Sequence, residues 1–195
     1  MSSDKKMMLI EASIDLFYKQ GFWKSSTASI AKNAKVATGT LFNYFSSKEQ
    51  LIDAVYLHIK SELLEELRSS YAQVEDQQQV KLVIENLWCR YVQWGVSNHV
   101  KHDLLQQLKL SDLVSDSAQQ TGMQSFSDLF QLMQQWLASG ELKPLDIEYF
   151  AELFQVQLEA AINIAKRHNL QDMALNKHML FSFEVFWDGV KDNSD

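Results

Sequence analysis

Small and hydrogen-bonding side chains gather in one short stretch of the chain. Its members are Thr38, Gly39, Thr40, Asn43 and Tyr44. A helix over residues 38–44 would point these groups outward, because the apolar residues Leu41 and Phe45 fall on its other side. The hydroxyls and the backbone amides near Gly39 suit phosphate oxygens, and the Asn43 amide can pair with an adenine edge. The stretch therefore predicts a surface that contacts double-stranded DNA.

The preceding residues predict a second short helix that holds this one in place. It spans about residues 27–34, with Ser26 as its N-cap, and it ends in a sharp turn. Apolar residues would clamp the two helices together: Ile30, Ala31, Ala34, Val36, Leu41 and Phe45. In such a pair the first helix braces the second, and the second lies in the major groove of DNA.

Residues on both sides of this helix pair carry a family resemblance. They are Leu9-Ile10-Glu11-Ala12, Leu16-Phe17, Gly21-Phe22, Ile30-Ala31, Gly39-Thr40-Leu41-Phe42, Tyr44-Phe45 and Ser47-Lys48-Glu49 followed by Leu51. Their types and spacing resemble the N-terminal DNA-binding domain of the tetracycline-repressor (TetR) family. The resemblance implies an all-α protein with an N-terminal three-helix helix-turn-helix domain. A C-terminal helical bundle for ligand binding and dimerisation would follow, giving about nine helices in all.

Two positions depart from the family pattern. Lys35 stands in the turn where the family has Gly, which costs about 1 kcal/mol if the backbone there is left-handed. Ala37 stands where the family has a capping Ser, so capping of the second helix falls to Thr38 or to a DNA phosphate. Both departures bear on the stability of the turn and on the contacts that it makes.

Nine residues are predicted to contact DNA. They are Ser26, Thr27, Lys35, Thr38, Gly39, Thr40, Asn43, Tyr44 and Lys48. Lys48 is included because it lies in the first turn of a long helix, where its charge opposes the helix dipole unless a phosphate offsets it. No Arg occurs in the first sixty residues, and Arg makes the commonest contact with guanine. We therefore expect a pseudo-palindromic operator that leans toward A·T base pairs.

Composition favours a helical protein of one or two domains. The chain has 195 residues, 46% of them hydrophobic, with one Pro, six Gly and one Cys. Residues 1–60 hold eight Lys against five acidic residues (+3), whereas residues 61–195 hold ten basic against twenty acidic residues (−10). A basic head on an acidic body suits a DNA-binding protein, although ordinary scatter gives such differences too. The sequence shows no membrane-length apolar run, no secretory leader and no Cys pair, so we expect a cytoplasmic protein without membrane contact.

Hydrophobic periodicity predicts helices along the rest of the chain. They cover residues 4–20, 48–71, 79–98, 101–114, 118–139, 146–168 and 172–191, with a polar boundary loop at residues 69–79. The helix over 79–98 is apolar on nearly every side, which predicts a place at the centre of a bundle. We expect a DNA-binding domain over residues 1–47 and an effector-binding and dimerisation domain over 48–195, connected by helix 48–71.

Aromatic and sulfur-containing side chains are frequent in the second domain. In the TetR family such a bundle encloses an effector pocket, and the candidate wall residues are Trp88, Tyr91, Trp94, His102, Phe126, Phe130, Met133 and Phe154. An aromatic stripe at helical spacing is more often core than pocket wall, so each assignment has a packing alternative. The implied ligand is a small hydrophobic or aromatic effector, and no cofactor is predicted.

The single cysteine and a pair of histidines are predicted to be neither a sensor thiol nor a metal site. Cys89 is expected to be a buried small hydrophobe rather than a sensor thiol. His99 and His102, followed by Asp103, have a spacing that could share a metal. The sequence fixes no third ligand there, so no metal site is predicted.

The predicted helices over 146–168 and 172–191 each carry two apolar stripes. One stripe of each helix can face the chain's own core, and the other needs a second chain to cover it. The residues assigned to a partner chain are Leu153, Val156, Ala160, Ile164, Met179, Phe183, Phe186 and Val190. We predict a two-fold homodimer through a four-helix bundle, as the resemblance also implies. Its recognition helices would lie about one DNA turn apart, roughly 35 Å.

These features favour a DNA-binding transcriptional regulator, and the resemblance implies a repressor that its ligand releases from DNA. Two alternatives stay open: a ligand-independent DNA-binding dimer, and a small helical enzyme or carrier that uses the second domain. The sequence shows no glycine-rich phosphate loop, paired-cysteine metal site or nucleophile motif, which argues against an enzyme.

Overall fold

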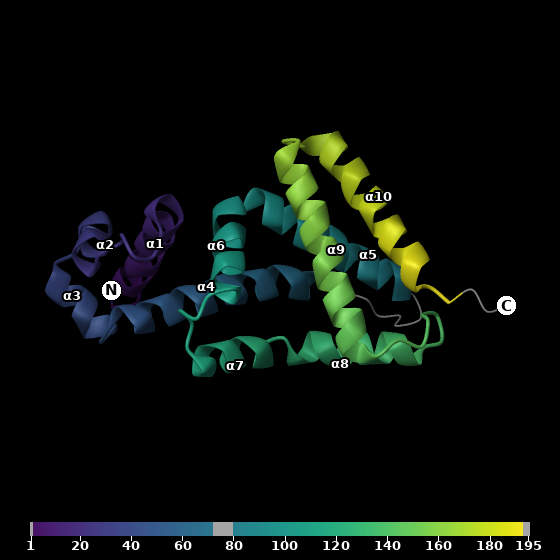
Figure 1. The fold of residues 1–195 in the computed structure, drawn as a ribbon, viewed down its shortest axis with the longest axis horizontal. Helices are drawn as coiled ribbons and strands as arrows, with labels where there is room; N and C mark the ends of the chain where they lie inside the picture. The colour runs from purple at the N-terminus through teal and green to yellow at the C-terminus, as the bar shows by residue number, and fades with distance from the viewer. Residues whose placement is uncertain (1, 72–79, 193–195) are drawn as a thin grey trace. The chain divides into compact units, whose positions relative to one another are not determined.

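The protein is built from α-helices, as the sequence predicts. A computed structural model describes residues 2–71 and 80–192. Its helices are α1 (Ser2–Gln20), α2 (Thr27–Asn33), α3 (Thr38–Tyr44), α4 (Lys48–Tyr71), α5 (Val80–Ser97), α6 (His99–Lys109), α7 (Asp116–Gln124), α8 (Ser127–Ala138), α9 (Ile147–Arg167) and α10 (Asp172–Val190) (Figure 1). An isolated bridge joins Leu142 and Lys191. The all-α fold class is therefore confirmed.

Most predicted helix ends are correct because their signals are local. Gly21 and Gly140 end α1 and α8 with φ of 81° and 85°, a conformation that Gly adopts without a side-chain clash. Asp146 caps α9, its Oδ1 accepting from the Glu148 and Tyr149 amides at 2.9 and 3.1 Å. The predicted bounds of α3 and α4 coincide with the observed ones. The predicted loop over 69–79 lies outside the described residues from position 72 onward.

The single helix predicted over residues 118–139 is wrong. The chain forms α7 and α8 instead, and the break lies at Ser125 and Phe126, where Phe126 has φ −97° and ψ 11°. Ser125 Oγ donates to the Gly122 carbonyl at 2.8 Å, so a side chain competes with the backbone at this point. The helix predicted over 101–114 also ends early, at Lys109. Ser111 Oγ donates to the Leu108 carbonyl at 3.1 Å just beyond that end.

The chain divides into two compact units. The first comprises Met1–Glu62 and Val100–Ser125, and the second comprises Leu63–His99 and Phe126–Asp195. The domain boundary predicted after residue 47 falls inside the first unit. The N-terminus of α7 is tied to the first half of α4, because the Ser115 amide and hydroxyl donate to the Asp53 carboxylate at 2.9 and 2.7 Å. Long-range contacts of this kind leave no mark in local sequence patterns.

The core of the first unit is apolar side chains from α1 to α4 and α6. Leu9, Ile10, Ile14 and Phe17 of α1 are buried, whereas Met7 is 41% exposed. Leu51, Val55 and Ile59 of α4 are also buried at a spacing of four residues, which gives this part of the helix an apolar stripe.

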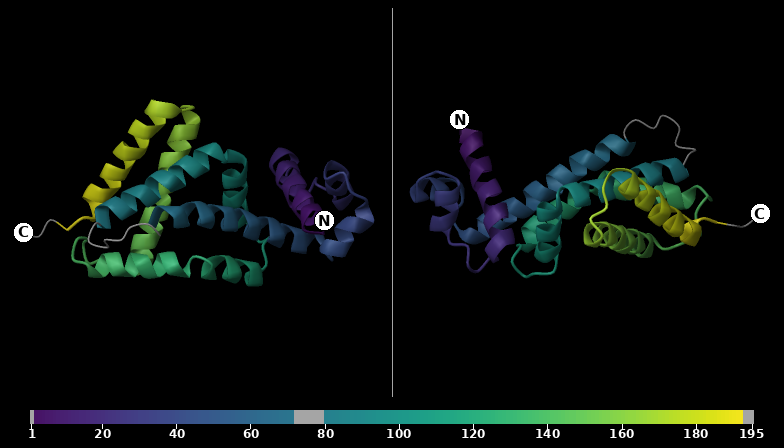
Figure 2. Two further views of the ribbon diagram at one scale, coloured as in Figure 1. Left: turned by 180° about the vertical axis from the view of Figure 1, so that it is seen from behind. Right: turned by 90° about the horizontal axis from the view of Figure 1, so that it is seen from above.

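The core of the second unit is a cluster of aromatic rings. Helix α5 packs against both α9 and α10, which lie side by side (Figures 1 and 2). The Trp88 ring stacks on Phe186 with centroids 5.1 Å apart, and it meets the edge of Phe154 at 5.7 Å. Trp88 Nε1 also donates to Ser182 Oγ at 3.0 Å. The prediction that α5 is a central, largely buried helix is confirmed by the burial of nine of its residues.

No helix in the described part of the chain is both long enough and apolar enough to span a bilayer.

The turn between α2 and α3 places Lys35 in a strained conformation, as its departure from the family pattern predicts. Lys35 has φ 55°. The Val36 amide donates to the Ala31 carbonyl at 3.0 Å, and the Lys35 amide donates to that of Lys32 at 3.1 Å. This is the Schellman arrangement, in which Gly is the preferred residue at the Lys35 position. Asn169 after α9, with φ 49°, has the same pair of bonds, but Asn tolerates this region better than Lys.

We expect Lys35→Gly to raise the free energy of unfolding by about 1 kcal/mol, because Gly removes the left-handed strain. Asn169→Gly should give a smaller gain, and Lys32→Gly inside α2 should lower stability by about 1 kcal/mol. Urea denaturation followed by circular dichroism measures all three. A loss of stability in Lys35→Gly would contradict the assignment of strain to this position.

Candidate nucleic-acid interface

Helices α2 and α3 are held together by small buried side chains. Ile30 and Ala31 of α2 and Leu41 of α3 are 0–1% exposed, and Ala34 and Phe45 are buried beside them. Ser26 Oγ accepts from the Ser29 amide at 3.1 Å, which caps α2 as predicted. Both helices also pack against α1. Helices α1 and α2 thus form a scaffold that fixes the orientation of α3.

The polar residues of α3 lie on the opposite side from this scaffold. Of the nine predicted contact residues, five are exposed and four are half-buried. The exposed ones are Ser26, Lys35, Thr38, Gly39 and Asn43, and the half-buried ones are Thr27, Thr40, Tyr44 and Lys48. All nine belong to the first unit. Their contact with DNA stays a prediction, and their accessibility is what such contact requires.

Gly39 has no structural reason to be glycine within its own chain. It has no left-handed backbone, and a Cβ built on it would meet no atom within 4 Å. Gly inside a helix costs about 0.5–1 kcal/mol relative to Ala. The missing side chain leaves room for another molecule to approach the backbone closely. A DNA backbone would make such an approach.

The N-terminus of α3 lacks a side-chain cap. Ala37 is the N-cap residue, with φ −67° and ψ 146°, and no side chain bonds the first amides of the helix. The departure from the family pattern therefore has the expected local effect. Thr38, which the sequence offered as an alternative cap, lies within the helix.

Lys48 makes a contact that the sequence did not predict. Its ammonium donates to the Phe22 carbonyl in the turn after α1. The chain itself therefore compensates the cation at the N-terminus of α4, whereas the sequence predicts a DNA phosphate in that role. Two side chains cap the first turn of α4: Ser47 Oγ accepts from the Gln50 amide at 3.3 Å, and Gln50 Oε1 accepts from the Ser46 amide at 3.0 Å.

Trp23 is a surface feature that sequence reasoning missed. It lies in the turn between α1 and α2 and is 85% exposed, whereas the four other Trp residues are buried. Its signal in the sequence is a large aromatic residue between the end of one helix and the cap of the next, outside any apolar periodicity. Phe42 on α3 is 49% exposed as well. Both side chains belong to the same compact unit as the polar face of α3.

The predicted effector-pocket residues do not form one group. His102 lies in the first unit, and the other seven lie in the second. Trp88 and Phe154 pack on each other in the aromatic core, whereas Phe130 is 40% exposed. The ring contact favours a core-packing role for Trp88 and Phe154 over a role as pocket wall. The pocket assignment of the eight residues stays a prediction.

The second unit has a cavity that the sequence did not indicate. Its volume is about 460 Å³, and it lies between the end of α5 and the turn from α9 to α10. It is lined by Gln93, Val96, Ser97, Leu170, Gln171, Asp172, Leu175 and Asn176. These residues were missed because they are mostly polar and lie at helix ends, away from the aromatic stripes.

Tyr91, another predicted pocket residue, belongs to a polar network within the second unit. Its hydroxyl donates to Glu159 Oε1 at 3.2 Å and accepts from Gln155 Nε2 at 3.0 Å. Burial raises the pKa of Tyr91 far above its usual range, and the charge of Glu159 adds to the effect. Tyr91 is therefore a neutral hydrogen-bond donor at physiological pH.

Cys89 is half-buried, and burial raises the pKa of its thiol to about 11, with a further contribution from Glu85. A thiol with this pKa is protonated near pH 7, so it is a poor nucleophile. These properties fit the expected packing role better than a sensor role.

The predicted dimer residues of α10 are wrong. Met179, Phe183, Phe186 and Val190 are 0–6% exposed and form part of the subunit's own core, so a partner chain cannot reach them. On α9, Val156, Ala160 and Ile164 are exposed and Leu153 is half-buried, as a partner-facing stripe requires. The exposed apolar residues of α10 are instead Met173, Leu180, Phe181 and Val185.

Comparison with known proteins agrees with this geometry. Residues 9–55 match the family described as bacterial regulatory proteins, tetR family. Over 55 residues the chain is 36% identical to the HTH-type transcriptional regulator LuxR of Vibrio harveyi. That match covers 28% of this chain and 27% of LuxR, so the chain spans only about a quarter of that relative in the alignment.

Two solved structures match over nearly their whole length. A TetR family transcription regulator from Marinobacter aquaeolei VT8 has a TM-score of 0.86 at 19% identity, covering 98% of this chain and 97% of that one, which shows a shared fold. A tetR family transcription regulator from Shewanella sp. PV-4 is 32% identical, with a TM-score of 0.84, covering 97% of this chain and 99% of that one. These relatives are transcriptional regulators rather than enzymes. With the helix-turn-helix geometry of α2 and α3, this agreement over the full chain shows that the protein belongs to the TetR family of transcriptional regulators.

Proposed function

We propose that this protein is a dimeric, ligand-controlled repressor whose helix α3 binds the major groove of its operator. The observation that carries the proposal is the exposed polar face of α3, in which Gly39 leaves room for a close approach. Thr38 and Asn43 offer hydrogen bonds on this face, and Phe42 offers apolar contact. A protein that binds chromosomal DNA acts in the cytoplasm, and we propose that location.

The operator that suits this face leans toward A·T base pairs. The amide of Asn43 can pair with adenine, and methyl groups of Thr and an aromatic ring can contact thymine methyls. No Arg is present in the first sixty residues to bind guanine, which leaves Lys35 as the cation that we assign to any guanine contact. Selection of binding sites from random duplex DNA tests this composition. A selected motif dominated by G·C pairs would contradict it.

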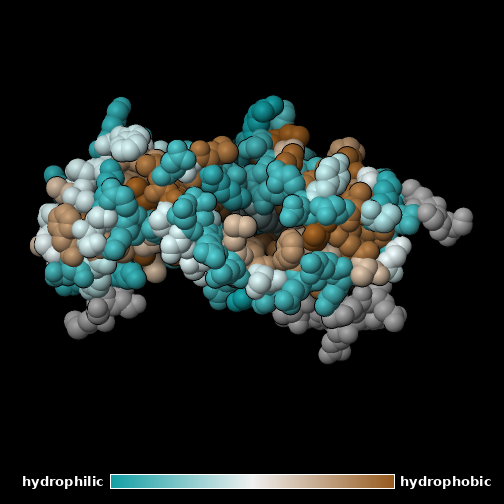
Figure 3. Space-filling model, turned by 60° about the horizontal axis from the view of Figure 1, so that its bottom comes forward, coloured by the Kyte–Doolittle hydropathy of each residue, from teal (hydrophilic) through white to brown (hydrophobic). Residues whose placement is uncertain are grey.

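The dimer that we propose uses the exposed apolar stripes of α9 and α10. Val156 and Ile164 on α9, with Leu180, Phe181 and Val185 on α10, are 42–68% exposed. Apolar patches that reach the surface are visible in brown in Figure 3. Two copies related by a two-fold axis would bury these stripes against each other in a four-helix bundle. Their α3 helices would then meet successive major grooves about 34–36 Å apart.

Control by a ligand rests on the continuity of α4, which runs from the first unit into the second. A ligand that prefers one conformation of the second unit can change the presentation of α3 through this helix, in proportion to its difference in affinity. The cavity between α5 and the α9–α10 turn is a candidate site, and its mixed lining suits a small ligand with polar groups. The aromatic core around Trp88 favours the alternative of a ligand-independent dimer, since its rings pack directly on one another. Fluorescence anisotropy of a labelled operator, measured across candidate effectors, separates the two.

Gly39→Ala should make the protein more stable and a weaker DNA binder. The added methyl improves helix propensity by about 0.5–1 kcal/mol. The same methyl would lie where a DNA backbone approaches, so we expect operator affinity to fall by about tenfold or more. Gln135→Ala in α8 is the control, because it changes an exposed helical residue outside both the α3 face and the proposed dimer stripes. It should leave operator affinity unchanged. Equal affinities of Gly39→Ala and the parent protein would remove the main support for this face.

Phe181→Glu should dissociate the dimer without unfolding the chain. Phe181 is 68% exposed in the single chain, so the substitution disturbs no core. In the proposed dimer it would place a charge in an apolar interface, weakening self-association by about 100-fold. Leu110→Glu, at a residue 91% exposed in the first unit, is the control and should stay dimeric. Sedimentation equilibrium gives the dissociation constants, and a Phe181→Glu protein that dimerises as tightly as the parent would exclude this surface.

A further inference from the structure

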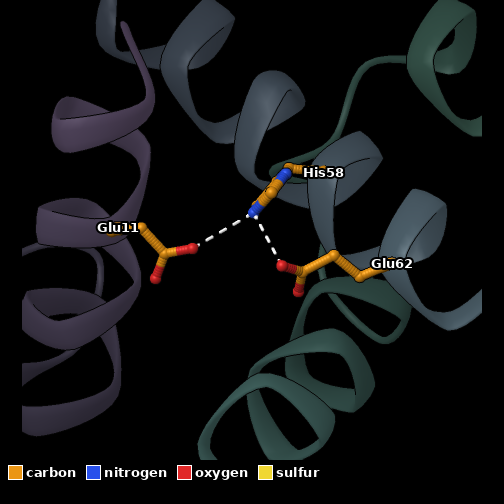
Figure 4. Close-up of side chains that lie close together, drawn as sticks. All are labelled: Glu11, His58 and Glu62. Carbon is orange, nitrogen blue, oxygen red and sulfur yellow. Dashed lines mark hydrogen bonds and ion pairs between the residues drawn. The ribbon is translucent and has the colours of Figure 1, made fainter. Parts of the chain in front are cut away.

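Three potential metal ligands converge within the first unit. Glu11 comes from α1, and His58 and Glu62 lie one helical turn apart on α4 (Figure 4). His58 Nε2 lies 3.2 Å from Glu11 Oε1 and 3.3 Å from Glu62 Oε1. The ligand atoms of all three residues lie within 4.8 Å of one another. The close-up shows the imidazole nitrogen directed between the two carboxylates.

We propose that Glu11, His58 and Glu62 form a binding site for a divalent transition-metal ion of the Zn²⁺ type. Zinc binds imidazole nitrogen and carboxylate oxygen at about 2.0–2.2 Å, so neighbouring ligands in a tetrahedral site lie about 3.4 Å apart. The two distances from His58 Nε2, 3.2 and 3.3 Å, are close to that separation. The ion would take three protein ligands and one water molecule, a coordination common for zinc with an open position.

Lys101 of α6 occupies the place where the cation would enter. Its ammonium lies 3.1 Å from Glu11 Oε1, and 3.0 and 2.7 Å from the two oxygens of Glu62. The ammonium thus contacts both carboxylates at the position where a metal cation would be held.

Charge and access both favour exchange of this ammonium for a metal ion. Two carboxylates and one ammonium leave these three groups with a net charge of −1. The Glu11 and Glu62 side chains are 45% and 36% exposed, so an ion can approach from solvent. On binding, the ion would take the His58 Nε2 lone pair and one oxygen from each carboxylate. Lys101 would keep its proton and turn toward water.

A metal ion at this position would join α1 to α4 within the first unit. At present these helices are joined here by hydrogen bonds and ion pairs with partly exposed side chains, which are weak individually. Coordination would replace them with bonds of fixed length and direction, so the stability of the folded form would rise with the logarithm of the metal concentration once the site is mostly occupied.

Co²⁺ is the probe for this site, because tetrahedral Co²⁺ with nitrogen and oxygen ligands absorbs visible light. The full chain, freed of metals with a chelator, is titrated with Co²⁺ in the absence of DNA. We expect one Co²⁺ per chain, displacement of the absorption by Zn²⁺, and a higher midpoint of thermal unfolding with either ion. His58→Gln and Glu62→Gln should each weaken binding by about tenfold or more, while His168→Gln, at an exposed residue outside the cluster, should bind as the parent does.

Lys101→Met separates a metal site from a merely structural ion-pair cluster. Removing the competing ammonium should raise Co²⁺ affinity by about tenfold, because the ion no longer meets a like charge at the carboxylates. No Co²⁺ absorption in the parent protein, equal binding by parent and His58→Gln, or weaker binding by Lys101→Met would each overturn the proposal. The titration involves no operator, so its result stands apart from the test of DNA binding.

Discussion

The close packing of small apolar side chains between α2 and α3 is the contact on which the candidate interface depends. Each of these helices has seven residues, too few to be stable alone in water. Ala31 lets the helices approach closely, and Ile30 and Leu41 then bury almost all of their surface. Because these contacts occupy one side of α3, its other side is free to carry polar groups. The stability of the pair and the composition of its exposed face thus have a single physical cause.

Sequence reasoning succeeds where the deciding interactions lie within a few residues of one another. The bounds of α3 and α4 are correct because caps, glycines and apolar spacing act locally. The strain at Lys35 could be foreseen for the same reason, since a Schellman turn favours Gly whatever surrounds it. The missed break between α7 and α8 shows the limit of apolar periodicity. Met123, Phe126 and Leu129 continue the apolar pattern across Ser125, whose hydroxyl bonds the backbone instead.

The wrong assignment of α10 has a different cause. This helix carries large apolar residues on several sides, so periodicity indicates two stripes without deciding which faces the core. The decision depends on Trp88, which is more than ninety residues away in the sequence and stacks on Phe186. Rings on that side can pack on other rings, which favours burying Phe183 and Phe186 over Phe181. The proposed partner-facing side of α10 therefore consists of the apolar residues that do not pack in the aromatic core, such as Phe181.

Local sequence patterns also fail to predict polar clusters that the fold assembles. The example here is the cluster of Glu11, His58, Glu62 and Lys101. The sequence contains His58 and Glu62 at a spacing of one helical turn, but such pairs are common on exposed helices. Only the fold adds a carboxylate from α1 and an ammonium from α6, which turns a pair into a cluster with a surplus negative charge. The first unit thus combines two kinds of contact. The apolar packing of α2 on α3 is nearly indifferent to ions, whereas the charged contacts of α1 and α6 with α4 depend on them. A change in ionic conditions should therefore act on the attachment of α1 to α4 before it reaches the α2–α3 pair.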